Sequence, residues 1–427
     1  MDKEKKRFFL LKKALFLFTT FSFISLGAET LTLDECIAWA KANNLQLLVS
    51  RMAVEKARKD LTLARADYYP TLGLSSSYRY SSSSASEGPD WLSSGRGSFA
   101  TGLSFQYQLY KGGARRAEEK IAEIKLKIAE ENYRQTENEV IYSLKQVFFK
   151  ILQMAEQISL MEEVLKRRQE NLILIRLNYN VGRENEPDVK QAAANLEETE
   201  YEYLKAQKNL SLAKKELAQI LNRPGEEIEI FYEDREKSFP SLDSLLKEAE
   251  ARRPEMIVAQ KNREIAQNQV KLAKSAYFPT LSFSSSYGWQ GSKITDQKDN
   301  WGLGVNLSLP LFNGFATKAK VAEAKISLKQ EDWQMSNLRL KIRQEVEEAY
   351  TNWQLSEKNV AVRKKMLAVV RSAYQLTKLQ YEQGRTTYFF LQQKEGELTQ
   401  AENNYLNALY NFRLAIATLE KVLGRSN

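Results

Sequence analysis

The stretch Tyr68–Tyr80, "YYPTLGLSSSYRY", returns at Tyr277–Trp289 as "YFPTLSFSSSYGW". The similarity extends outward, because residues 33–80 align without gaps with residues 242–289. Further along, "LYKGGARRAEEKIAEIKL" matches "LFNGFATKAKVAEAKISL". The chain is therefore one unit of about 190 residues used twice. The copies differ in length only between residues 81 and 108, which is typical of an exposed loop.

The start of the chain has the three-part pattern of a signal peptide. A basic leader is followed by an apolar run of about a dozen residues and by small residues that end near Ala28. A membrane anchor is the alternative, but the run is too short to span a bilayer. We expect residues 1–28 to be removed and the chain to be exported. The leader also holds six of the basic residues behind the formal charge of +9, and nothing indicates a nucleic-acid partner.

The residue types that many catalytic and metal sites need are missing from this sequence. The chain has no histidine, which excludes a Ser-His-Asp triad, a Cys-His pair and any histidine-containing metal site. Cys36 is the only cysteine, so no intrachain disulfide can form. The sequence contains no phosphate-binding loop. We expect no cofactor, no metal and no enzymatic activity.

Each copy begins with a helix and then changes to strands. Thr32 and Glu35 form a capping-box pattern at the start of a helix predicted over residues 32–67, and its counterpart is predicted over 241–276. A proline ends each of these helices. The helix-to-strand junctions are therefore Pro70 and Pro279, and alternation predicts strands over 71–81, 98–109, 280–290 and 301–310.

Alternation along the strands separates two kinds of side chain. One face is apolar or aromatic, as at Leu72, Leu74 and Tyr78, and would meet lipid, while the other is small and polar. Strands of this length cross a bilayer at a tilt. A soluble sandwich is the alternative, but each copy supplies a single hairpin flanked by very long helices. The predicted lining of a barrel lumen is a passive wall of Ser75, Ser77, Gln106, Gln108, Ser284 and Asn306.

After each pair of strands the sequence predicts a helix far longer than a globular core. Residues 114–180 contain neither proline nor glycine, and a helix of that length is on the order of 100 Å long. It needs lateral partners along its whole length, which indicates coiled-coil packing. We predict long helix hairpins over residues 113–222 and 314–424.

The predicted fold is mainly α with a transmembrane β part. Its organisation is a signal peptide (1–28), a first repeat (29–222), a linker (223–240) and a second repeat (241–427). Four strands cannot close a barrel, and an open sheet edge in lipid has unpaired backbone groups. The strands must therefore be shared between chains. A dimer would give an eight-stranded barrel filled by side chains, whereas a trimer would give twelve strands and a lumen, which the small polar face favours.

The chain resembles the TolC family of outer membrane efflux proteins, the outer membrane factors, over essentially its whole mature length. The resemblance rests on "LTLDECIAWAKANN", on the junctions "ADYYPTL" and "SAYFPTL", on "LPLFNGF" with "QLYKGGA", and on the paired turns "YNVGR" and "YEQGR". It implies a homotrimer with a twelve-stranded barrel in the outer membrane, continuous with an α-helical barrel in the periplasm. It also implies two partners, a periplasmic adaptor and an inner-membrane pump of the RND, ABC or another type.

The resemblance gives a role to the ends of the two helix hairpins. In the family these ends close the channel at rest and engage the adaptor. Glycine is expected there in any case, as the left-handed cap of a helix. The matching residues of this chain are Tyr179, Gly182, Arg183, Tyr381, Gly384 and Arg385.

The aperture departs from the family pattern. Members commonly place an aspartate a few residues after the hairpin glycine, where three copies narrow the entrance. Asp188 matches that position in the first copy, but Phe390 matches it in the second. Our hypothesis is that residues 388–390 form an apolar plug that gates by packing and dewetting rather than by charge. The predicted aperture residues are Glu184, Glu186, Asp188, Tyr388, Phe389, Phe390 and Gln393.

These patterns predict a passive exit duct for solutes or proteins, part of a tripartite efflux or type I secretion system. It would lie in the outer membrane of a Gram-negative-type bacterium, in contact with its lipid, and extend into the periplasm. The alternative is an exported structural coiled-coil protein without transport. The glycine- and serine-rich strand face favours the duct. The resemblance implies that selectivity for the cargo lies largely in the pump.

Overall fold

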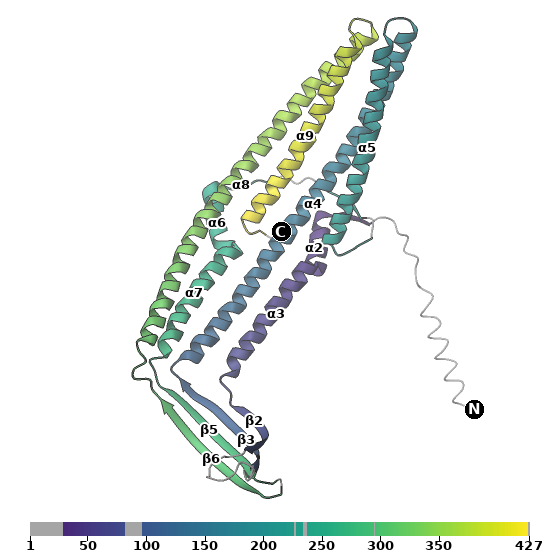
Figure 1. Cartoon of the computed structure of the whole chain (residues 1–427). Helices are drawn as coiled ribbons and strands as arrows, with labels where there is room; N and C mark the ends of the chain where they lie inside the picture. Colours follow the sequence, from purple (N-terminus) through teal and green to yellow (C-terminus); the bar gives the residue numbers. More distant parts are fainter. Residues whose placement is uncertain (1–28, 82–95, 226–227, 234–236, 294, 426–427) are drawn as a thin grey trace, which may run out of the picture.

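In a computed structural model the chain forms one long body, with a β-sheet at one end and two helix hairpins reaching the other (Figure 1). The structure describes residues 29–81, 96–225, 228–233, 237–293 and 295–425. The predicted signal peptide therefore lies outside the described residues, as does most of the length difference between the two copies.

The sheet has four antiparallel strands. They are β2 (Thr71–Ser81), β3 (Arg96–Lys111), β5 (Thr280–Gly291) and β6 (Gln297–Ser308), in the spatial order β2-β3-β5-β6. The third strand of the sheet thus comes from the second repeat, so the two repeats share one sheet. Strands β2 and β6 are its two edges.

The register brings the apolar residues of all four strands to one face. Leu103 lies opposite Leu74 on one side and Tyr287 on the other, while Gly102 lies opposite Ser75 and Gly288. Between Gln108 and Tyr110 the register shifts, so one extra residue is accommodated as a β-bulge. The apolar side chains are not buried within the chain. Those at the two edges are the most open, including Leu72, Leu74, Trp301, Leu303 and Val305.

The helix predicted over residues 32–67 is two helices, α2 (Leu33–Asn43) and α3 (Leu45–Ala66). Asn44 lies between them, and its side chain accepts hydrogen bonds from the backbone of the first turn of α3. The predicted capping box is confirmed, because the Glu35 carboxylate accepts from the Thr32 backbone at 2.8 Å and the Thr32 hydroxyl accepts from Glu35.

The second copy has the same break. The helix predicted over 241–276 consists of α6 (Leu242–Arg252) and α7 (Pro254–Ser275). The residue between them, Arg253, is extended because the proline that follows disfavours a helical conformation. A single helix was therefore the wrong prediction for both copies.

The two long hairpins consist of α4 (Ala114–Asn180) with α5 (Glu186–Ile220), and of α8 (Ala316–Glu382) with α9 (Tyr388–Val422). Near the sheet the helices lie side by side in the order α3-α4-α7-α8, and further away in the order α5-α4-α9-α8 (Figure 1). This order follows that of the strands, because α3 leads into β2 and β6 leads into α8. The helices and the sheet therefore form one continuous curved layer.

The middle of this layer is thickened by a small sheet that the sequence did not predict. Strand β1 (Glu29–Thr32) pairs in parallel with β4 (Ile228–Phe231), which lies within the expected linker over 223–240. Beneath it, apolar residues of α2, α4 and α5 form the largest core of the described chain. Cys36 is fully buried there, and burial raises the pKa of its thiol to about 11, so the only cysteine is unreactive.

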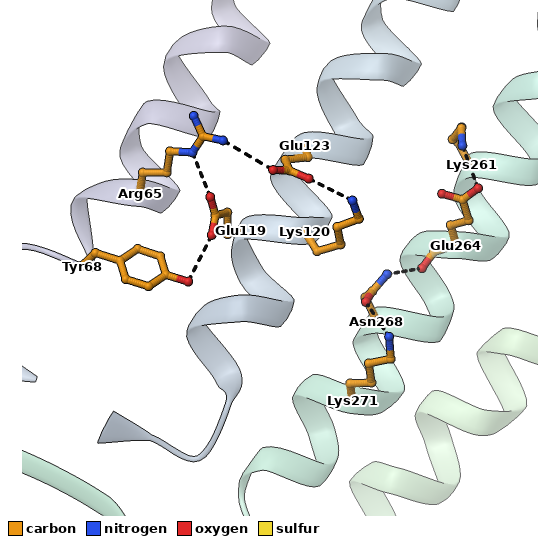
Figure 2. A network of polar contacts seen from close by, with 9 residues as sticks. All are labelled: Arg65, Tyr68, Glu119, Lys120, Glu123, Lys261, Glu264, Asn268 and Lys271. Atoms are coloured by element: carbon orange, nitrogen blue, oxygen red, sulfur yellow. Dashed lines mark hydrogen bonds and ion pairs between the residues drawn. The ribbon is translucent and has the colours of Figure 1, made fainter. Parts of the chain in front are cut away.

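The repeated string is tied to the helix layer just above the sheet. Arg65 at the end of α3 forms ion pairs with Glu119 at 2.9 Å and with Glu123 at 3.4 Å on α4 (Figure 2). The Tyr68 hydroxyl donates to the same Glu119 carboxylate at 3.0 Å. Tyr68 therefore helps to set the angle at which the chain leaves the helix layer for strand β2.

The return from strand to helix is made by two residues in a left-handed conformation in each copy. These are Gly112 and Gly113 in the first copy and Gly314 and Phe315 in the second. A Cβ atom on Gly112 would lie 2.4 Å from the Ser275 carbonyl oxygen, whereas one on Gly113 would meet nothing within 4 Å.

We expect Gly112→Ala to lower the thermal unfolding midpoint clearly more than Gly113→Ala does. Each variant carries the left-handed strain of an alanine, about 1–2 kcal/mol. Only Gly112→Ala adds a clash with the end of α7. Equal midpoints for the two purified variants would show that α7 does not approach this turn as closely as described.

Candidate functional site

The two hairpin ends are built alike. After α4, the amide of Gly182 donates to Tyr179 and that of Arg183 donates to Asn178, and Gly182 has a φ of 76°. After α8, Gly384 and Arg385 repeat these bonds with Tyr381 and Gln380, and the φ of Gly384 is 72°. Both ends are therefore Schellman caps, as expected for the two glycines.

The return helices start in different ways. Asn185 caps α5 by accepting a hydrogen bond from the Asp188 amide at 3.0 Å, whereas Thr387 forms no side-chain bond at the start of α9. Asp188 is thus part of a helix start and is only half-exposed. Glu186 is exposed and pairs with Lys190 on the same helix at 2.8 Å.

Behind the ends, the two hairpins pack against each other through tyrosines. Tyr374 and Tyr381 of α8 and Tyr388 of α9 are each about 95% buried among leucine, isoleucine and alanine side chains of all four long helices. The ring centroids of Tyr381 and Tyr388 are 6.3 Å apart. The aperture hypothesis groups Tyr388 with Phe389 and Phe390 in an apolar plug, and the ring of Tyr388 lies inside this contact between the hairpins.

Tyr381 also makes the polar link between the two hairpin ends. Its hydroxyl donates to the Glu184 carboxylate at 2.9 Å. Burial raises the pKa of Glu184, and the nearby Asp188 raises it further, although the bond from Tyr381 acts in the opposite direction. This pair joins the end of the first hairpin to the second through a hydrogen bond.

The remaining expected residues lie at the surface. Phe389 and Phe390 are 67% and 52% exposed, and their rings meet edge to face at 5.7 Å. Tyr179, Arg183, Arg385 and Gln393 are also exposed, and Gln393 donates to Glu397 along the same helix. An exposed aromatic pair at the start of α9 is the most unusual surface feature of the hairpin ends.

Two acidic residues that the sequence analysis did not single out lie deeper between the hairpins. Glu402 of α9 is 3% exposed and pairs with Arg167 of α4 at 2.8 Å and with Arg371 of α8 at 3.2 Å. Glu395, two turns closer to the hairpin end, is 5% exposed and accepts from the Asn171 amide of α4 at 2.8 Å. Both carboxylates therefore link α9 to the first hairpin.

The residues predicted to line a lumen share one face of the sheet. Gln106 lies opposite Ser284, which in turn lies opposite Gly304, and Gln108 lies opposite Ser282. The predicted lumen residues Ser75, Ser77 and Asn306 fall on this same face by register. Pro70 and Pro279 directly precede β2 and β5, so the junctions are where the sequence placed them.

Among the described residues, none of the helices combines the length and the apolarity needed to cross a bilayer. A duplicated chain with an open four-stranded sheet, apolar on one face and polar on the other, and an open layer of very long helices defines a class of protein. It is the class of membrane channel components.

The comparisons with known proteins agree with this class. The chain matches the outer membrane efflux protein family over residues 37–223 and 245–425, and it belongs to that family. It is 24% identical to the outer membrane protein TolC of Escherichia coli strain K12, over 91% of this chain and 81% of the relative.

Solved structures show the same fold. CusC superposes with a TM-score of 0.81 at 21% identity, covering 92% of this chain and 91% of CusC. The CmeC outer membrane channel of Campylobacter jejuni superposes with a TM-score of 0.79 at 20% identity, covering 92% and 86%. The protein is thus an outer membrane efflux channel, a transport duct rather than an enzyme, and the structural alternative without transport finds no support.

We expect Tyr381→Phe to loosen the contact between the hairpin ends. Losing the bond to Glu184 should lower the free energy of local opening in the first turn of α9 by about 1 kcal/mol. The backbone amides of this turn should then exchange their hydrogens roughly fivefold faster. The double variant with Glu184→Gln should exchange no faster than Tyr381→Phe alone. Additive effects of the two substitutions would mean that this hydrogen bond does not couple the hairpins.

Proposed function

We propose that three copies of this chain close into one continuous duct across the outer membrane and into the periplasm. The main support is that, on each side of the chain, the open edge of the sheet continues into the open edge of the helix layer. On one side, α3 continues into edge strand β2, and on the other, edge strand β6 continues into α8. Joining β6 of one copy to β2 of the next pairs the strands and also brings the two helix edges together.

The exposed apolar residues fit this closure. On α8 they recur every seven residues, first at Ile326, Trp333 and Leu340 and then from Leu355 onward, which is the spacing of a coiled-coil seam. The opposite edge exposes a matching apolar surface. Its residues are Leu45, Val49 and Met52 on α3 and Tyr201, Leu204 and Leu212 on α5.

Three copies fit the strand number better than two. A barrel of eight strands is nearly filled by its own side chains, whereas twelve strands enclose a water-filled lumen. The sheet face that would point inward carries serine and glycine at the Ser284–Gly304 pair and at the Ser75–Gly102 pair. Such small residues suit an open passage.

The hairpin ends are the proposed site of regulation and docking. Energy would come from an inner-membrane pump acting through a periplasmic adaptor that engages Tyr179, Arg183 and Arg385 around the two glycine caps. In the resting duct the exposed Phe389 and Phe390 of three copies would form the constriction. This narrows the plug hypothesis to two residues, because Tyr388 is already buried in the contact between hairpins.

The oligomeric state is the first test of this proposal. The protein extracted from the outer membrane in mild detergent should have the mass of three chains by light scattering corrected for bound detergent. A stable monomer would leave strands β2 and β6 with unpaired edges in the membrane. That result would contradict the shared barrel.

The constriction is tested by single-channel conductance in planar bilayers. Phe389→Ala and Phe390→Ala together should raise the resting conductance severalfold, because removing two apolar rings per chain admits water to the entrance. Val181→Ala is the matched control, since Val181 is equally exposed but lies at the end of the first hairpin. An unchanged resting conductance in the double variant would rule out the aromatic constriction.

A further inference from the structure

A small polar cavity lies between the two hairpins, just behind their ends. It has a volume of about 120 Å³ and is lined by side chains of α4, α5 and α9, including Arg168, Asn171, Asn195, Tyr388 and Glu395. A cavity of this volume holds several water molecules. It opens beside the buried tyrosine contact, so a change here acts directly on how the hairpins pack.

Glu395 is the acidic group of this cavity, and its charge is incompletely compensated. One carboxylate oxygen accepts from Asn171 at 2.8 Å. The other is buried without a hydrogen bond and lies 3.9 Å from the Arg168 guanidinium, beyond hydrogen-bond distance. The guanidinium of Arg168 itself donates to the Asn195 carbonyl of α5. The side-chain oxygen of Asn171 and the hydroxyl of Tyr374 are also buried close to it.

Charged and titratable side chains of α4, α8 and α9 surround Glu395. Arg167 and Arg168 approach from α4, Tyr374 and Lys378 from α8, and Tyr388 from the start of α9 itself. Arg167 is already bound to Glu402, and Lys378 is bound to Glu170 of α4 at 3.1 Å. Arg167 and Lys378 are thus engaged by other carboxylates, and Arg168 is the cation that lies within ion-pair distance of Glu395, at 3.9 Å.

Glu402 offers a natural contrast two turns further along α9. It is as deeply buried as Glu395, but both of its oxygens are bound by arginines from the two neighbouring helices. A charge at Glu402 therefore holds the hairpins together. A charge at Glu395 is poorly compensated while the hairpins are packed and is hydrated when they separate.

We propose that Glu395 makes the contact between the two hairpins sensitive to pH, so that the hairpins pack more tightly when its carboxyl group is protonated. Within the proposed duct this would favour the closed entrance in an acidic medium, and that consequence rests on the proposed function. A protonated carboxyl can donate a hydrogen bond as well as accept one inside the cavity. It also removes the buried charge.

The direction of the pH effect on packing follows from the difference in the Glu395 pKa between packed and separated hairpins. Burial raises the pKa of Glu395, against smaller opposing effects of Arg168, the Asn171 bond, Arg167 and Lys378. In separated hairpins the group meets water and its pKa returns towards the ordinary value. The packed state therefore binds the proton more tightly, and packing is favoured as the pH falls through the raised pKa and weakened above it.

The test measures the separation of the hairpin ends in the full-length protein by pulsed electron paramagnetic resonance. Spin labels are placed at Asn180 and Gln383, which are exposed at the two ends, in a Cys36→Ser background. Labelled chains are diluted with unlabelled ones so that the distance within one chain is read. In the parent protein the separated population should fall between neutral and mildly acidic pH, by at most about tenfold per pH unit for one proton.

Three variants make the result specific. Glu395→Gln should remain packed at both pH values and lose the pH response. Asn171→Ala, which removes the one hydrogen bond to the carboxylate, should shift the response to higher pH. Glu402→Gln should separate the hairpins more at every pH and keep the response, because it leaves two arginines unpaired. A parent-like response in Glu395→Gln, or its loss in Glu402→Gln, would overturn the proposal.

Conductance of the same proteins separates this proposal from the proposed function. If the distances respond to pH as expected but the conductance does not, the contact between the hairpins is sensitive to pH but does not control the entrance of the duct. If no variant conducts at any pH, the duct proposal fails, while the distances still decide whether Glu395 controls the packing.

Discussion

The architecture depends on the hydrogen bonds of two strand edges. Within the described chain, β2 pairs with β3 and β6 pairs with β5, so one side of each edge strand needs a partner from outside. In lipid, unpaired backbone groups cost several kcal/mol each. Since each edge strand is continuous with an edge helix, the rotation that pairs the strands in the proposed trimer would also bury the apolar stripe of α8. One geometric operation would thus satisfy the sheet and the helices together.

The contact between the hairpins has a different character from the core in the middle of the chain. There, Leu144, Phe148 and Leu217 are completely buried, as in an ordinary globular protein. Towards the ends, three buried tyrosines and the Glu402–Arg167 ion pair lie among the aliphatic side chains. Ion pairs and hydroxyl groups can exchange their partners for water at moderate cost, whereas exposing leucine always costs free energy. In the proposed duct, the polar groups at this contact would lower the cost of separating the hairpin ends.

Much of this architecture could be predicted from the sequence, because its signals are periodic. The duplicated string, the alternation of the strands and the long runs without glycine or proline predicted the sheet and the hairpins. The break at Asn44 was missed, since asparagine is an ordinary helix residue until its side chain caps a new helix. Glu395 and Glu402 were missed although a signal exists. With Leu391 and Leu398 they follow the apolar period of α9, where a carboxylate is out of place.

The small parallel pairing of β1 with β4 limits the independence of the two repeats. Glu29 pairs with Ile228 and Thr32 pairs with Phe231. The first residues of the first repeat therefore find their partner only in a strand that follows that repeat in the sequence. A chain that folds as it emerges, amino terminus first, cannot finish its middle region until more than half of it has been delivered. The two repeats of the sequence are therefore not two independent folding units, because β1 and β4 join the start of the first repeat to the segment that follows it.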